Sequence, residues 1–240
     1  MIARDVLVFR KNGGATTRLR RVLDALRSVY GPPARPLSDP FALVLWENVA
    51  YLAGDEKRAQ AFALLYQKTG LAPKRILAAP DSVLHEVARR GILADDRAGR
   101  LREIASIAID QFGGDLSSAL PRTPKEAAKA LRKFPSIGEP GAEKILLFAR
   151  REPRLALDSN GLRVLLRLGY GTESKSYSAS YRSAQGAAEA ELPAEFDALI
   201  EAHQLLRRHG QEVCRRAAPL CDRCPVMSEC EYYARATGGR

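Results

Sequence analysis

The sequence predicts an all-α fold. Apolar residues recur three and four positions apart over most of the chain, as they do on one face of a helix. The strict alternation of apolar and polar residues that marks a half-buried strand is nearly absent. Glycine and proline residues interrupt the periodic stretches at short intervals, so we expect short helices with short connections in a compact orthogonal bundle.

The first helical stretch carries an apolar stripe from Leu19 to Tyr30, and most of its arginines fall off that stripe. The sequence Gly-Pro-Pro at 31–33 stops it. Residues 40–53 are nearly all apolar and predict a buried helix.

A second clear stripe runs from Leu101 to Phe112, and two glycines end it. The segment 171–183 is rich in Ser and Tyr, breaks the periodicity and is expected to be a loop. Further helices are expected over 55–69, 81–90, 124–133, 140–151, 159–169, 184–191 and 195–209.

The composition excludes several classes of protein. Apolar residues make up 46% of the 240 residues and charged residues 28%, which indicates a globular chain and not a disordered one. No apolar run approaches the roughly 18 residues that span a bilayer, and the stretch 6–9 is too short for the core of a signal peptide. We therefore expect a cytoplasmic protein with no membrane partner, associated with the nucleoid if the protein is bacterial. The net charge of +10 favours a polyanionic partner, most simply nucleic acid, although basic soluble proteins are common.

All cysteines of the chain lie in one short segment, with the spacing Cys214-x6-Cys221-x2-Cys224-x5-Cys230. In a reducing compartment such a group indicates a metal site and not disulfides. Four thiolates can bind either Zn²⁺ or a cubane iron–sulfur cluster. The alternative, four unrelated thiols, fits poorly because free cysteines are usually scattered.

The segment 131–142 lies between two periodic stretches, and Pro135 and Gly138 bracket a tight turn in it. It predicts a helix, a hairpin and a second helix, whose first backbone N–H groups can bind a phosphate. Helix–turn–helix connections are common, so this pattern alone is weakly specific. The candidate phosphate-binding residues are Pro135, Ser136, Ile137, Gly138 and Gly141.

Twenty residues after Gly138, Asp158 directly precedes another apolar helix. An Asp at this place is usually an N-cap, which is the alternative to any chemical role. The two roles are compatible, because a carboxylate has several acceptor sites.

The hairpin, Asp158 and the cysteine loop follow one another as in the endonuclease III (helix-hairpin-helix-GPD) family of DNA glycosylases, which the chain resembles over about residues 37–232. The resemblance implies a two-domain helix-hairpin-helix DNA glycosylase fold with a C-terminal iron–sulfur cluster loop. Residues 38–153 would form the central helical domain, and residues 1–37 with 154–240 the cluster domain. The DNA would lie in the cleft between them.

The same resemblance implies the chemistry. The partner would be double-stranded DNA carrying a damaged or mismatched base, bound by a monomer, with the target nucleotide flipped into a pocket. Asp158 matches the catalytic Asp of the family, which stabilises positive charge on the sugar. The four cysteines would hold a [4Fe–4S] cluster, and Arg215 and Arg216 in its first loop would contact phosphates. For each arginine the alternative is a solvated charged loop.

Two positions depart from the family pattern. Bifunctional members have a Lys two residues after the last hairpin Gly, and this chain has Pro140 there; the usual middle Gly is Ser136. Without that amine we expect a monofunctional enzyme that uses water as its nucleophile. Lys144 lies one helical turn further on and is a candidate displaced amine. We favour the alternative, a surface Lys that pairs with Glu143 or with solvent.

The end of the first core helix, Trp46-Glu47-Asn48, carries three further candidates. Asn48 is expected to fill the gap left by the flipped base, and either Trp46 or Tyr51 to stack on a base. Glu47 is a candidate acid for a purine leaving group. The alternative is that Trp46 belongs to the core and Glu47 is a solvated helix end.

Three hypotheses follow. The leading one is a monofunctional DNA glycosylase of base excision repair. The second is a bifunctional glycosylase/AP lyase that uses Lys144 or another amine. The third is a non-catalytic protein that binds a DNA structure.

Overall fold

The computed structural model describes residues 16–50 and 53–238. These residues form helices and loops and contain no strand, so the predicted all-α class is confirmed. None of the described helices is long and apolar enough to cross a membrane. The α-helices are α1 (Arg18–Tyr30), α2 (Pro40–Asn48), α3 (Asp55–Thr69), α4 (Pro73–Leu77), α5 (Asp81–Ala88), α6 (Ala94–Phe112), α7 (Leu116–Ala119), α8 (Pro124–Leu131), α9 (Glu139–Phe148), α10 (Ser159–Leu168), α11 (Tyr177–Glu189), α12 (Phe196–Glu212) and α13 (Glu231–Thr237).

Side-chain caps begin several of these helices. The Thr17 side chain accepts from the N–H of Arg20 at the start of α1, and the Asp39 side chain accepts from the N–H of Ala42 at the start of α2. Gly70 ends α3 with a φ of 61°, a left-handed conformation in which glycine meets little steric cost.

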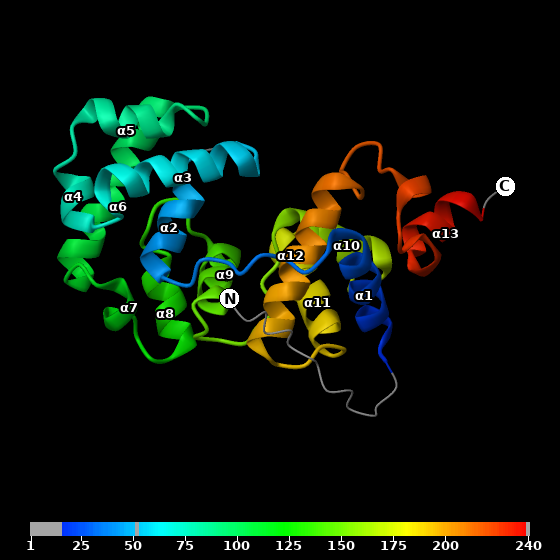
Figure 1. Ribbon diagram of the computed structural model, residues 1–240. Coiled ribbons are helices and arrows are strands. Elements are labelled where there is room, and N and C mark those ends of the chain that lie inside the picture. Colours follow the sequence, from blue (N-terminus) through cyan, green and yellow to red (C-terminus); the bar gives the residue numbers. More distant parts are fainter. Residues whose placement is uncertain (1–15, 51–52, 239–240) are drawn as a thin grey trace, which may run out of the picture.

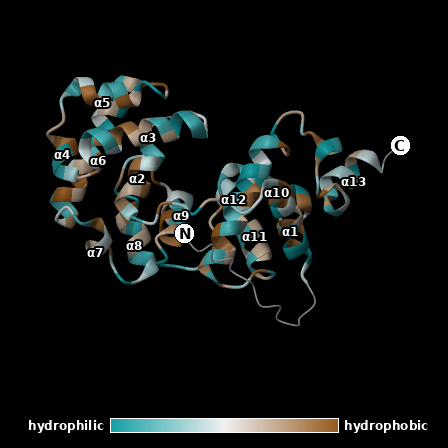
Figure 2. Ribbon diagram, viewed as in Figure 1, coloured by the Kyte–Doolittle hydropathy of each residue, from teal (hydrophilic) through white to brown (hydrophobic). Residues whose placement is uncertain are grey.

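Two apolar cores divide the helices into two lobes (Figure 1). The first lobe contains α2 to α9, and its core runs from Phe41 to Leu146. In the second lobe, α1 packs with α10, α11 and α12, so the core joins residues 19–26 to residues 147–226. Figure 2 shows the apolar residues gathered on the inner faces of the helices of both lobes. The boundaries at 37/38 and 153/154 stay a prediction that this arrangement supports.

Two expectations about elements are wrong. The helix expected over 40–53 ends at Asn48. The segment 171–183 is not a loop throughout, because α11 begins at Tyr177, where the Ser176 side chain accepts from the N–H of Ala179. The buried face of α11 consists of Ser, Tyr, Ala and Gln and so carried no aliphatic stripe.

The short helices α4, α7 and α13 and the 3₁₀ turns Cys221–Arg223 and Met227–Glu229 were not predicted. Elements of three to seven residues are too short to show a period of 3.6. The stretch 6–9, residues 1–15 of the expected cluster domain and Tyr51 lie outside the described residues.

Candidate functional site

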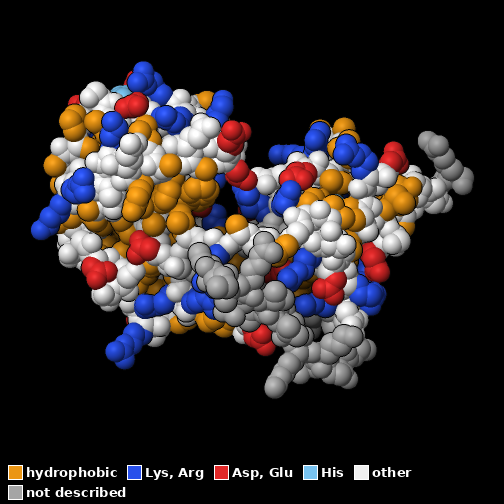
Figure 3. All heavy atoms as spheres, viewed as in Figure 1, with side chains coloured by type: hydrophobic (Ala, Val, Ile, Leu, Met, Phe, Trp, Pro, Cys, Tyr) orange, Lys and Arg blue, Asp and Glu red, His pale blue; other side chains and the backbone are white. Residues whose placement is uncertain are grey.

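A cleft of about 620 Å³ separates the two lobes, and Figure 3 shows acidic and basic side chains around this hollow. Its wall comes from the end of α1 and the segment 31–37 that follows it, the end of α2, the start of α3, α9 and one side of α12. Segments far apart in the sequence therefore meet at one place.

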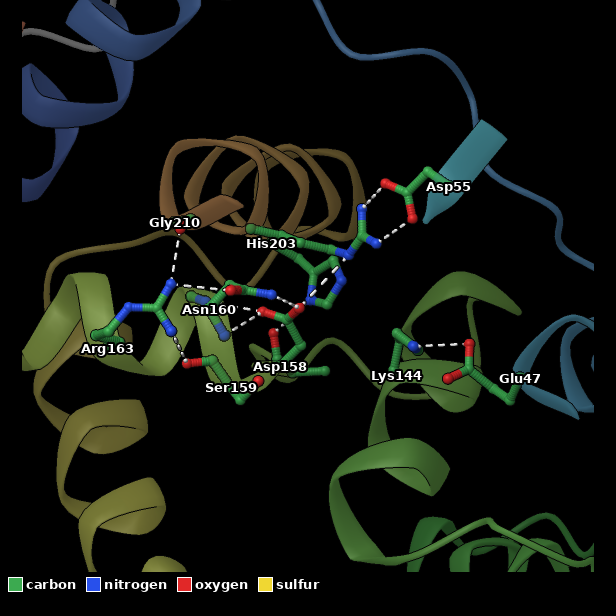
Figure 4. Close-up of polar contacts among 12 residues, drawn as sticks. Glu47, Asp55, Lys144, Asp158, Ser159, Asn160, Arg163, His203 and Gly210 are labelled. Atoms are coloured by element: carbon green, nitrogen blue, oxygen red, sulfur yellow. Dashed lines mark hydrogen bonds and ion pairs between the residues drawn. The ribbon is translucent and has the colours of Figure 1, made fainter. Parts of the chain in front are cut away.

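Asp158 is the N-cap of α10, as the sequence predicted (Figure 4). Its Oδ1 accepts from the backbone N–H groups of Asn160 (3.0 Å) and Gly161 (2.7 Å), and its Oδ2 accepts from Asn160 Nδ2 (3.0 Å). The side chain is 23% exposed. These contacts fix the carboxylate in one orientation while leaving part of it accessible.

Arg207, on α12, joins Asp158 to the other lobe. Its Nε lies 3.4 Å from Asp158 Oδ2, and its terminal nitrogens donate to both carboxylate oxygens of Asp55, the first residue of α3. The sequence analysis did not identify Arg207 or Asp55. The sequence did contain one indication of a role for Arg207: it lies four residues after His203, on the mostly apolar face of α12, where an arginine is unusual.

His203 lies beside this group and is 3% exposed. Its Nδ1 donates to the carbonyl oxygen of Ala156 at 2.8 Å, which fixes the tautomer. Burial, and after it the positive charge of Lys144, lowers the pKa of His203 to about 4. His203 is therefore neutral near pH 7.

Lys144 lies on the cleft wall and not on the open surface. Its Nζ is 2.7 Å from Glu47 Oε1, and the two side chains are 17% and 19% exposed. The favoured expectation of a surface Lys paired with Glu143 or solvent is wrong, because Glu143 is buried and bound by Tyr181, Arg182 and Gln185. Glu47 is likewise not a solvated helix end.

Asn48 does not fit the predicted role of a wedge in the DNA. It is 1% exposed, and its Nδ2 donates to the carbonyl oxygens of Val44 (3.0 Å) and Pro135 (2.9 Å). The amide thus ties the hairpin to the end of α2. Trp46 is half-buried and packs edge-on against Phe62.

The hairpin from Pro135 to Gly138 leads directly into α9. Ser136 takes the place of a glycine with a φ of 61°, and its Oγ accepts from Arg97 (3.2 Å) and Arg100 (3.3 Å). Gly138 is the N-cap of α9, and no described side chain accepts from the N–H groups of its first turn. The remaining hairpin residues differ in exposure: Ile137 is buried, Pro135 and Gly141 are half-buried, and Ser136 and Gly138 are exposed.

A second basic surface, which we call the arginine groove, has a volume of about 870 Å³. Ser159 and Asn160 line one side of it, so it begins beside Asp158. Arg215 and Arg216 are exposed, and their carbonyl oxygens accept from Arg167 at 2.7 and 3.2 Å. The arginines that line it are Arg163, Arg167, Arg215, Arg216 and Arg235.

The four cysteines line one common cavity together with Val213, Leu220 and Met227. Burial is the main cause that raises the pKa of Cys224 to about 11, and the charges of the other three cysteines raise it further. The walls of this cavity are mainly apolar, so a bound cation would stabilise thiolates in it. Within the described residues, no three His, Cys, Asp or Glu side chains are grouped tightly enough for a single metal ion.

No family model matches the chain. Curated relatives nevertheless cover most of it. Endonuclease III of Thermotoga maritima is 23% identical over 202 residues, which are 84% of this chain and 87% of the relative. Thymine-DNA glycosylase of Aeropyrum pernix is 26% identical over 225 residues, which are 92% and 96% of the two chains.

Solved structures share the fold. A non-covalent endonuclease III–DNA complex matches with a TM-score of 0.71 and 21% identity, over 92% of this chain and 97% of that chain. A thermostable thymine-DNA glycosylase also matches with a TM-score of 0.71 and 21% identity, over 90% and 95%. The chain is thus similar in sequence to proteins of the endonuclease III-like superfamily and shares their fold.

As an endonuclease III-like protein, this chain lacks the hairpin amine that the resemblance led us to look for. Pro140 is in the first turn of α9, where a missing N–H costs nothing. The lysine of α9 that reaches the cleft is Lys144, one turn later. Pro140 and Lys144 are therefore the two residues that bear on the choice between a monofunctional and a bifunctional reaction.

Proposed function

We propose that this protein is a monofunctional DNA glycosylase of base excision repair. The observation that carries the proposal is Asp158, a part-exposed carboxylate fixed by three hydrogen bonds. It lies against Arg207 of the cleft wall and directly precedes Ser159 and Asn160, which line the arginine groove. Homologues named endonuclease III and thymine-DNA glycosylase support the same activity.

In the proposed reaction, duplex DNA binds across the two lobes, and the target nucleotide turns out of the helix into the cleft. The hairpin N–H groups and the arginine groove bind phosphates and supply affinity without reading sequence. Breaking the N-glycosidic bond leaves positive charge on the sugar, and Asp158 stabilises that charge. Water then attacks the sugar, since Pro140 offers no amine.

Lys144 supports a second candidate function, a glycosylase with AP lyase activity. The observation in its favour is that its ammonium lies on the cleft wall. Against it, Lys144 Nζ lies 2.7 Å from Glu47 Oε1, and an amine engaged in an ion pair is not free to attack the sugar. We therefore place Lys144 and Glu47 in the pocket for the flipped nucleotide as an ion pair.

We also propose that Cys214, Cys221, Cys224 and Cys230 hold a [4Fe–4S] cluster. The donor set fits, because four thiolates line a cavity whose other walls are mainly apolar. When bound, the cluster would cross-link the loop and would take no part in the excision of the base. Arg167 fastens this loop to α10, since it donates to Cys214 Sγ (3.3 Å) and to the carbonyl oxygens of Arg215 and Arg216.

A panel of duplexes tests the proposal. Each duplex carries one of four bases, thymine or uracil opposite guanine, 3-methyladenine, or 1,N6-ethenoadenine, and is read with and without alkali. We expect strand breaks at one or more of these bases only after alkali. Breaks without alkali, with a borohydride-trapped adduct that Lys144→Ala removes, would assign the bifunctional reaction. No excision of any base would favour the non-catalytic DNA-binding protein.

A further inference from the structure

Arg207 binds two carboxylates from different lobes, and it binds them unequally. Two hydrogen bonds of 2.7 and 2.5 Å join its terminal nitrogens to Asp55, in the paired geometry that makes Arg–carboxylate contacts strong. Its contact with Asp158 is a single approach of Nε at 3.4 Å. The guanidinium is therefore held mainly by Asp55.

Arg207 and Asp55 are both charged near neutral pH. Burial works to lower the pKa of Arg207, but the hydrogen bonds and charge of Asp55, followed by the charges of Asp158 and Glu47, raise it overall. The hydrogen bond from Arg207 is the largest cause that lowers the pKa of Asp55. The Arg207 side chain is only 27% exposed, so solvent screens these charges incompletely.

The net charge of Asp158, Arg207 and Asp55 decides how well this group can stabilise a cationic sugar. Asp158 and Arg207 alone would form a neutral pair, and a neutral pair stabilises a cationic sugar poorly. Asp55 supplies a second negative charge, so the group of three keeps a net charge of −1 beside the cleft. The same two hydrogen bonds hold the guanidinium away from a closer, paired contact with Asp158.

We infer that Asp55 is a positioning residue that acts through Arg207: it neutralises and retains the guanidinium so that Asp158 keeps its negative charge for the sugar. This inference rests on the proposed function. It assigns a role in catalysis to a residue of the first lobe that lies about 100 positions from Asp158 in the sequence and is linked to it through Arg207.

Two abasic-site analogues measure the effect without knowledge of the target base. One duplex carries a pyrrolidine, whose protonated ring nitrogen imitates the cationic sugar, and the other carries a neutral tetrahydrofuran. The ratio of their Kd values reports the charge that Asp158 presents, and general DNA affinity cancels in it. Wild-type protein should bind the pyrrolidine duplex more tightly.

In Asp55→Asn, Arg207 turns toward Asp158, and the preference should fall about tenfold, as expected for an uncompensated charge within 4 Å in a partly buried site. In the double variant Asp55→Asn/Arg207→Met, Asp158 is left alone, and the preference should return to within about threefold of wild type. If Asp55 and Arg207 served only as a structural link between the lobes, the double variant would not recover the preference, because both variants break that link. Asp197→Asn on α12 is the matched control, since it removes an exposed partner of Arg150 and should leave the ratio unchanged.

Excision of a base from the four-duplex panel separates the two possible failures. If the wild type excises a base and Asp55→Asn has the wild-type binding ratio, or the double variant does not recover, the inference is overturned while the proposed function stands. If the wild type neither excises a base nor prefers the cationic analogue, both are overturned. Thermal unfolding of each variant shows whether it is folded.

Discussion

Replacing Asp158 with Asn separates the charge of this side chain from its work as a helix cap. Asn keeps an oxygen for the N–H groups of Asn160 and Gly161, which Oδ1 now accepts at 3.0 and 2.7 Å. It places an amide nitrogen where Oδ2 accepts from Asn160 and faces Arg207. The variant therefore loses the negative charge, the hydrogen bond from Asn160 Nδ2 and the ion pair with Arg207, but it keeps the cap.

The two consequences differ in size. Asn and Asp are similar N-caps, so unfolding should become easier by no more than about 1 kcal/mol from the cap, with at most a similar loss from the part-exposed ion pair. A preorganised charge that stabilises a transition state is worth roughly 3 kcal/mol, which is about a hundredfold or more in rate. Excision should thus fall far more than stability.

Single-turnover excision followed by alkali measures the rate, and thermal unfolding measures the stability. Asp39→Asn is the matched control, because Asp39 caps α2 through the N–H of Ala42 and should leave excision unchanged. Binding to undamaged DNA should change little in either variant, since neither carboxylate is a phosphate contact. Excision by Asp158→Asn at nearly the wild-type rate would return Asp158 to the role of a plain helix cap.

Three further outcomes are expected. Cys221→Ser should lose iron, absorbance near about 400 nm and thermal stability, because three thiolates do not complete the cluster; a colourless wild type with bound zinc would overturn the cluster assignment. Arg215→Glu should weaken lesion-bearing and undamaged duplexes by the same factor and flatten the log–log salt dependence by roughly one unit, whereas a loss on lesion DNA alone would contradict a phosphate contact. The His203 contribution to stability is complete above its ordinary pKa of 6.5 and is lost as the pH falls toward 4, since only the unfolded chain takes up the proton in that range. At pH 5 this lowers the free energy of unfolding by about 2 kcal/mol, and His203→Gln should remove that part of the pH dependence when chemical denaturation is measured at several pH values. The same pH dependence in variant and wild type would show that His203 ionises in the folded protein.

The parts of the site that depend on local spacing could be predicted from the sequence. A carboxylate directly before an apolar helix caps it whatever the rest of the chain does, so Asp158 was found at its place. The cysteine loop is likewise short, and its four cysteines line one cavity. The hairpin turn was visible because Pro135 and Gly138 bracket it.

The parts that depend on packing between the lobes could not be predicted. Lys144 meets Glu47 only because α9 and α2 face each other across the cleft. Arg207 meets Asp55 over 152 positions of sequence, and periodicity carries no information about such a pair. Asn48 has the composition of a wedge, but the fold turns its amide toward the carbonyl oxygen of Pro135. In each case the sequence indicated a polar residue, and tertiary contacts decided its partner.

The distribution of charge separates DNA binding from the proposed chemistry. The chain carries +10, and the arginine groove presents exposed cations such as Arg215 to solvent, where salt screens them strongly. Asp158 is part-buried, so solvent screens its charge less. Its ion-pair partner Arg207 is also bound by Asp55, so the three side chains together carry a net negative charge. In the proposed reaction, a duplex attracted by the arginines would present its nucleotide to a carboxylate of opposite sign. That reversal over a short distance suits a substrate whose phosphates are anionic and whose sugar becomes cationic only while the bond breaks.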